Sequence, residues 1–252
     1  MKRSVAILLL MVLLVAAVSS VAAQDKVLPL PKVSVEVGKA TKPEEVATTL
    51  QILFIMTILS LAPAILILTT AFTRIIVVFH FLKQAMGTQQ VPPAQILVGL
   101  AMFLTFFVMA PTWNKVNQDA LQPYLSNKIT FQEAYDKGVG PLREFMFRQT
   151  REEDLALFVS MAKIDKPKNH DDVPTYVVIP AFAISELRIG FQIGFILFIP
   201  FLIIDMVVSS ILMSMGMMML PPMLVSLPFK ILLFIMVDGW RLIVGSVVNS
   251  FQ

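Results

Sequence analysis

The sequence has 252 residues, of which 57% are hydrophobic and only 15% are charged, and its mean hydropathy is +0.79. Since ordinary soluble domains carry roughly 25% charged residues, this composition indicates a membrane protein. The net charge of +3 is small and dispersed, which argues against a nucleic-acid partner, and the absence of cysteine excludes disulfides, thiolate metal sites and cysteine nucleophiles.

The N-terminus has the form of a secretory signal peptide. Lys2 and Arg3 precede an apolar run that ends near Val18, and small residues follow it. These features predict a cleaved segment 1–23, with the cut between Ala23 and Gln24, so that the mature chain begins outside the cytoplasm. An uncleaved first helix is the alternative, but the apolar run is shorter than the roughly 20 residues that a membrane span requires.

Two segments follow the predicted cleavage site. Residues 24–48 are polar and contain prolines, and we interpret them as an extracytoplasmic linker. Residues 49–111 are expected to form a first apolar helical hairpin, whose first helix Pro63 should kink. The connection within this hairpin, 73–93, carries basic residues and no acid, which favours a cytoplasmic location.

Residues 112–180 differ in character from the rest of the chain. They hold more than half of its charged residues in amphipathic helical patterns, and they are expected to form a solvated periplasmic insert. The charge run 151–154 (REED) is interpreted as a helix start, because acidic side chains are favoured near the positive end of the helix dipole.

A second apolar hairpin is expected over 181–252, with helical segments at 187–213 and 223–251. The break between them, 213–223, reads MSMGMMMLPPM and is rich in methionine. Unbranched, polarizable thioethers suit irregular packing or a deformable seal, and they are also soft ligands for Cu(I). The residues alone favour packing, then a seal, then a metal site.

Four ionisable side chains interrupt the interior of the last two apolar segments: Asp205, Lys230, Asp238 and Arg241. Charges at bilayer depth are costly, so these should face protein or water rather than lipid. Asp238 and Arg241 are three residues apart and are expected to pair on one helix face. Lys230 is expected to pair with Asp205 of the partner helix. A structural role for these charges is favoured over an ion or proton relay.

The sequence offers little support for an enzyme. His80 and His170 are the only histidines, and neither a zinc-protease motif, a P-loop nor a dinucleotide-binding glycine motif occurs. We therefore predict an all-α, integral membrane-type protein without catalytic activity, cofactor or metal.

Three stretches, 71–111, 179–195 and 204–240, closely resemble the FliP family of flagellar export-gate subunits and its homologues in virulence type III secretion. The cleaved signal and the charged insert suit the flagellar branch better. The resemblance implies a subunit of a ring-like helical pore in the basal body, at the bacterial inner membrane with a periplasmic portion. Unfolded flagellar proteins pass through this pore. It also implies helices made for protein contacts rather than for lipid.

The resemblance implies partners and site residues as well. FliQ-like and FliR-like subunits join a pentamer-like ring of this chain, along with other export apparatus components. The methionine-rich loop forms a gasket across the pore, which would here consist of Met215, Met217, Met218, Met219 and Met223. Assembly contacts would involve Glu186, Arg188, Lys230 and Asp238.

Two alternatives remain open at this point. A small ion-coupled transporter would use Asp205, Lys230 and Asp238 as a relay, and a copper permease would use the methionines as ligands.

Overall fold

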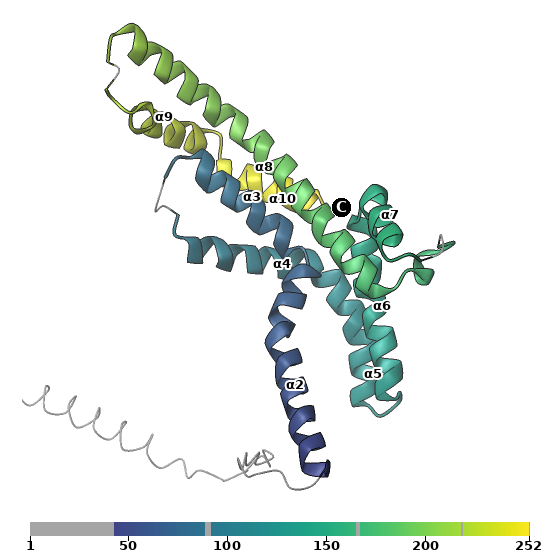
Figure 1. Ribbon diagram of the computed structural model, residues 1–252. Coiled ribbons are helices and arrows are strands. Elements are labelled where there is room, and N and C mark those ends of the chain that lie inside the picture. The colour runs from purple at the N-terminus through teal and green to yellow at the C-terminus, as the bar shows by residue number, and fades with distance from the viewer. Residues whose placement is uncertain (1–42, 89–91, 165–166, 218, 252) are drawn as a thin grey trace, which may run out of the picture. The chain divides into compact units, whose positions relative to one another are not determined.

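The computed structural model describes residues 43–88, 92–164, 167–217 and 219–251, and every regular element within them is a helix (Figure 1). This confirms the all-α class. The chain divides into two compact units, Met1–Ile52 and Leu53–Gln252. The expected signal peptide with Ala23 and Gln24, and most of the expected linker, lie outside the described residues.

Within the part of the chain that the structure describes, three helical runs are long and apolar enough to cross a membrane: Leu50–Leu68, Ala94–Leu125 and Thr175–Ser214. A bent helix pair near the C-terminus makes a fourth if it counts as one span. The first run belongs to α2 (Pro43–Leu68), which continues through Pro63. None of the residues in this run is buried within the chain, so the helix presents apolar side chains all round.

Helix α3 (Phe72–Ala85) corrects the expectation that 73–93 is a connection between two spans. Its side chains Ile75, Val78, Phe79 and Leu82 are completely buried. They recur at the spacing of one helical face. The basic residues suggested a loop, but the charge of Arg74 is satisfied inside the protein, as described below, and the helix is part of the core.

Helix α8 (Thr175–Ser214) is 40 residues long and starts well before the expected segment. Helix α3 packs along it (Figure 1). Two glycines of α8 allow the close approach. A β-carbon at Gly190 would lie 3.0 Å from Val77 Cγ1, and one at Gly194 would lie 2.6 Å from the ring of Phe81. Small residues four apart are typical of tightly packed membrane helices.

The charged insert is helical, and it begins without a break from the preceding apolar helix. Its elements and their neighbours are α4 (Ala94–Val116), the π-helical turn η1 (Asn117–Leu121), α5 (Gln122–Leu125), α6 (Phe131–Gln149), α7 (Glu152–Met161) and the 3₁₀ turn η2 (His170–Asp172). Thr130 and Glu133 form a capping box at the start of α6, and the backbone hydrogen bond from Thr130 lowers the pKa of the Glu133 carboxyl.

The REED run starts α7, as the sequence predicts. Its last acid, however, is not solvated. Asp154 is buried and accepts a hydrogen bond from Ser185 Oγ of α8 at 2.7 Å, and the same hydroxyl oxygen accepts the backbone amide of Arg151 at 3.1 Å. The helix start is therefore joined to α8 by a buried polar contact.

The expected final segment is two helices rather than one. Helices α9 (Pro222–Met236) and α10 (Gly239–Asn249) meet at an angle of 66°. At the break, Asp238 adopts a left-handed conformation with φ of 51°, a region that Asp and Asn enter more readily than other residues with a side chain.

Candidate functional site

The methionine-rich stretch (residues 213–223, the methionine loop) comprises the end of α8, the connection 215–221 and the start of α9, and the two helices lie side by side (Figure 1). Gly216 follows the C-cap of α8 with φ of +74°. The Met217 amide donates to the Leu212 carbonyl at 3.0 Å, and the Gly216 amide donates to the Met213 carbonyl at 3.1 Å. This pair of bonds is a Schellman motif, which ends the helix at a defined direction.

The methionines of this loop are exposed rather than packed within the chain. The exposed fractions are 62% for Met213, 65% for Met215, 99% for Met219 and 55% for Met223. Met217 is half-buried, and Met218 lies outside the described residues. Plain core packing within one chain, the interpretation that the residues alone favoured, therefore does not explain the four exposed methionines.

A cluster of charged and polar groups lies beside Met223. Lys230 Nζ donates to Asp205 Oδ2 at 2.6 Å and to the Ala85 carbonyl at the end of α3 at 3.1 Å. The Ser226 hydroxyl donates to Asp205 Oδ1 at 2.5 Å, and the Met223 carbonyl lies 3.2 Å from the same Oγ as an alternative acceptor. The pairing of Lys230 with Asp205 is the one expected from the sequence. We call Asp205, Ser226, Lys230 and the Ala85 carbonyl the loop clasp.

A second buried ion pair joins Arg74 of α3 to Glu186 of α8, and both side chains are at most 1% exposed. Arg74 Nε donates to Glu186 Oε2 at 3.0 Å, and Nη2 donates to Oε1. The remaining guanidinium donors reach the Ser250 carbonyl at 2.7 Å and Gln149 Oε1 at 3.0 Å. The guanidinium also lies over the Phe251 ring, 3.9 Å from its centroid.

The sequence singled out Glu186 but missed its partner, Arg74, which was assigned to a connection. Helical spacing was the signal that could have found it, because Arg74 falls on the same face of α3 as Val78. Arg188, expected to form an assembly contact, is half exposed, and its Nη1 lies 3.9 Å from Glu153 Oε2.

The expected pair of Asp238 with Arg241 is wrong. Among the described residues no ion pair joins them. The reason is the break in the helix: Asp238 stands at the left-handed N-cap of α10, so it lacks the regular three-residue helical spacing to Arg241. Both side chains are exposed.

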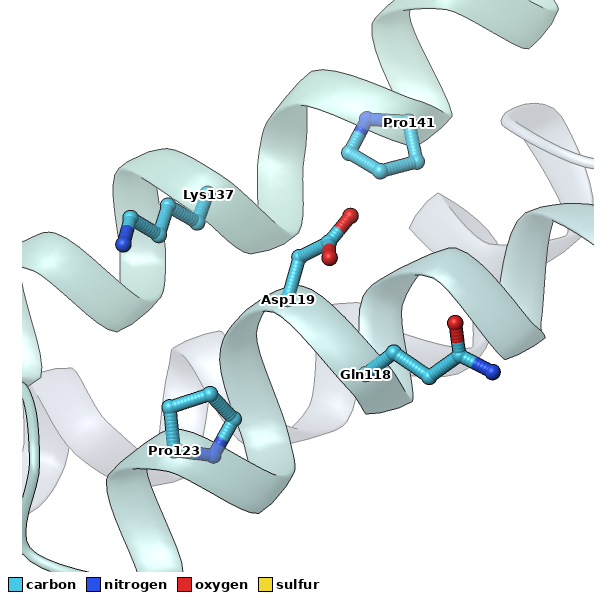
Figure 2. Close-up of a pocket in the computed structure, with 5 residues that line it drawn as sticks. All are labelled: Gln118, Asp119, Pro123, Lys137 and Pro141. Carbon is cyan, nitrogen blue, oxygen red and sulfur yellow. The ribbon is translucent and has the colours of Figure 1, made fainter.

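Among the hollows of the described surface, the one between the η1–α5 run and α6 gives no sign of a catalytic centre. Figure 2 shows this hollow of about 450 Å³, in which the Lys137 amine points away from the Asp119 carboxylate. Convergent polar groups are what a catalytic site requires, and this hollow lacks them. Within the described ranges, no group of three or more His, Asp or Glu side chains is placed to hold a metal ion.

Comparison with protein families matches residues 55–247 to the FliP family, which covers most of the chain. This chain belongs to the FliP family. Among its relatives, the flagellar biosynthetic protein FliP of Bacillus subtilis is 56% identical over 217 residues, which is 86% of this chain and 98% of the relative.

FliP proteins from distant bacteria match as well. That of Aquifex aeolicus is 48% identical and covers 88% of this chain and 92% of its own length. That of Borreliella burgdorferi is 49% identical, and the match covers 82% of this chain and 83% of the relative. These matches confirm the resemblance drawn from the sequence. The methionine loop, the loop clasp and the Arg74–Glu186 pair all lie inside the matched FliP region.

Proposed function

We propose that this chain is a pore-forming subunit of the flagellar export gate, with the methionine loop as its gasket. As a FliP protein, it is a component of the flagellar export apparatus. The observation that carries the proposal is the exposure of the methionines on a loop whose helical ends are well defined. Met219 is 99% exposed, although methionine is apolar. Such side chains repack around variable shapes, as a seal around unfolded polypeptides must.

The apolar helices support assembly with other chains. Of the windows that qualify as spans, those in α2 and α8 are 0% and 11% buried within the chain. In α8, Phe191, Phe195 and Ile196 are more than half exposed. Exposed apolar surface of this extent marks contact with lipid or protein. We propose that copies of this chain form a ring together with FliQ-like and FliR-like subunits, as part of the basal body.

The buried ion pairs fit a structural role better than a relay. Arg74 and Lys230 each donate hydrogen bonds to partners of their own chain. Buried pairs of this kind hold helices in register but are no path for ions by themselves. We therefore propose that Glu186 and Asp205 hold the subunit's shape, and that Arg188, Asp238 and Arg241, which are exposed, contact neighbouring subunits.

The location proposed is the inner membrane, reached through the signal peptide and its cleavage between Ala23 and Gln24, with the insert 112–180 on the periplasmic side. Mass spectrometry of the purified N-terminus tests the cut directly. A mature chain beginning at Gln24 supports this route, and an intact Met1 or a start elsewhere contradicts it.

The native mass of the mature protein in mild detergent tests the assembly, with the chain expressed alone and together with FliQ-like and FliR-like partners. A discrete ring-sized oligomer that grows on co-expression supports the gate. A stable monomer or dimer whose mass does not change on co-expression overturns the gate assembly and favours the small-transporter alternative.

Replacing Met217, Met218 and Met219 by leucine tests the gasket. Leucine keeps the apolar volume but is branched and less adaptable, so secretion of flagellar subunits should largely continue while the closed gate leaks ions. If wild type binds copper and the triple variant does not, the methionines are metal ligands and the gasket is wrong.

A further inference from the structure

We propose that the loop clasp holds the methionine loop in its closed position, and that Lys230 is its central positioning residue. The inference rests on the gate function proposed above. A general stabilising role would affect the whole fold, whereas the proposed role of the loop clasp is to position the methionine loop.

The clasp joins three helices through a single ammonium group. Lys230 of α9 donates both to Asp205 of α8 and to the Ala85 carbonyl, which is at the C-terminal end of α3. The C-terminus of a helix carries partial negative charge, so the ammonium is favoured there for a second reason. Ser226 adds a bond from α9 to the same carboxylate. Both arms of the hairpin are thereby tied to α3.

Helix α3 is a suitable fixed point because it lies in the core of the chain. Helix α9, by contrast, has three buried residues: Ser226, Lys230 and Phe234. Two of the three belong to the clasp. The first two turns of α9, before Phe234 reaches the core, therefore carry little buried apolar surface, and the clasp ties this part of the helix to α8 and α3.

The clasp also lies directly against the end of the methionine loop. The Met223 carbonyl lies 3.2 Å from Ser226 Oγ, within hydrogen-bond distance. A β-carbon at Gly87, just after α3, would lie 3.6 Å from Met223 Cγ and 3.7 Å from Lys230 Nζ. The last methionine of the loop and the clasp ammonium thus share one contact surface, so movement of either changes the other.

The Lys230–Asp205 ion pair of the clasp can separate at a lower cost than a fully buried pair. The Asp205 side chain is 33% exposed, whereas that of Lys230 is 3% exposed. A carboxylate in contact with water regains hydration when its partner leaves, which lowers the cost of separation compared with a fully buried pair. The hairpin arms can therefore part at this point while the buried Arg74–Glu186 pair keeps α3 on α8.

Distance measurement tests the positioning directly. The chain has no cysteine, so spin labels can be placed at Gln84→Cys and Leu220→Cys, both at exposed positions, in the full mature chain in detergent. We expect a narrow label distance in this background, and a broad or shifted one when Lys230→Met is added. The matched control is Asp238→Asn, which removes an exposed charge outside the clasp and should leave the distribution narrow.

Two further variants keep the test decisive. Ser226→Ala removes one clasp bond and no charge, so it should broaden the distribution less and serves if Lys230→Met does not fold. Lys230→Arg keeps a cation and should retain more of the narrow distribution than Lys230→Met. A distribution that stays narrow in folded Lys230→Met and Ser226→Ala overturns the proposal.

The functional readout is ion leak through the gate co-expressed with its FliQ-like and FliR-like partners. With secretion-complex assembly intact, we expect Lys230→Met to raise the leak roughly tenfold, the change produced by losing one good interaction in a two-state closure. Deleting residues 217–219 serves as the reference. If the 217–219 deletion does not leak ions, the gasket is wrong. If the deletion leaks ions but the Lys230→Met gate does not, the gasket stands and only the clasp is wrong.

Discussion

At the scale of single residues, the buried cations Arg74 and Lys230 donate hydrogen bonds to oxygen atoms of other segments. Arg74 is 1% exposed, yet each of its guanidinium nitrogens donates to an oxygen of another segment. Burying a charge without partners would cost far more than its bonds return. The position of this arginine therefore depends on Glu186, Gln149 and the carbonyl of Ser250 together.

Removing one side of the Arg74–Glu186 pair should be severe. We expect Arg74→Met or Glu186→Gln to destabilise the folded chain by about 3–5 kcal/mol, because the remaining polar group stays buried. That is a large share of a total stability of roughly 5–15 kcal/mol. Thermal unfolding in detergent measures the loss. Arg188→Met, at an exposed position, is the control and should change stability little. Equal melting temperatures for Arg74→Met and Arg188→Met would contradict the structural role of the Arg74–Glu186 pair.

Gly216 controls the direction of the chain at the start of the methionine loop. Its φ of +74° disfavours any side chain, so Gly216→Ala should cost about 1–2 kcal/mol. A leakier gate with near-normal assembly is the expected result, checked by ion uptake and by native mass. Gly245→Ala, in α10 with open space around it, is the control and should stabilise slightly if it has any effect, because alanine is the better helix former. A Gly216→Ala gate that is as tight as wild type would show that the loop direction is not critical.

At the scale of the helices, the contact of α3 with α8 depends on the absence of side chains at two positions. Gly190 and Gly194 lie against Val77 and Phe81 of α3. This close approach also brings the Arg74 guanidinium to the Glu186 carboxylate. Packing and charge pairing are thus consequences of the same helix–helix spacing.

Gly194→Ala should therefore separate the two helices. Its new methyl group would meet Phe81 Cβ at 2.7 Å, and this atom lies too near the backbone to move aside freely. We expect about 1–3 kcal/mol of destabilisation from overpacking. Thermal melting in detergent checks it. Gly99→Ala in α4, where a β-carbon meets nothing within 4 Å, is the matched control and should stabilise slightly because alanine is the better helix former. A harmless Gly194→Ala would mean that the α3–α8 contact is adaptable.

At the scale of the whole molecule, the sequence predicted the helical class, the apolar helices and the Asp205–Lys230 pair, because hydropathy and charge in apolar segments are local signals. It did not predict the burial of α3, since the partners of Arg74 come from α6, α8 and the C-terminal segment and no local pattern connects them. Nor did it predict the break at Asp238. The Asp238–Gly239 pair is a turn signal, but the apolar residues on both sides of it favoured one continuous helix.

The exposure of the methionine loop leads to a prediction about the assembly. If copies of the chain form a ring with these loops at the centre, the same residue of neighbouring copies must lie close together. Met219→Cys in the otherwise cysteine-free chain should then form a disulfide between copies under mild oxidation, seen as a dimer on a non-reducing gel. Gln132→Cys, at an exposed position of α6 in the charged insert, is the control and should remain largely monomeric on the same gel.

Dimers that form equally at both positions would report random collision, and their absence at 219 in an intact complex would mean that the loops do not converge on a common axis. Convergence would bury the Met219 side chain, which is 99% exposed in the single chain, against its copies. An apolar side chain at the tip of a helical hairpin is then a contact between subunits rather than a liability in water.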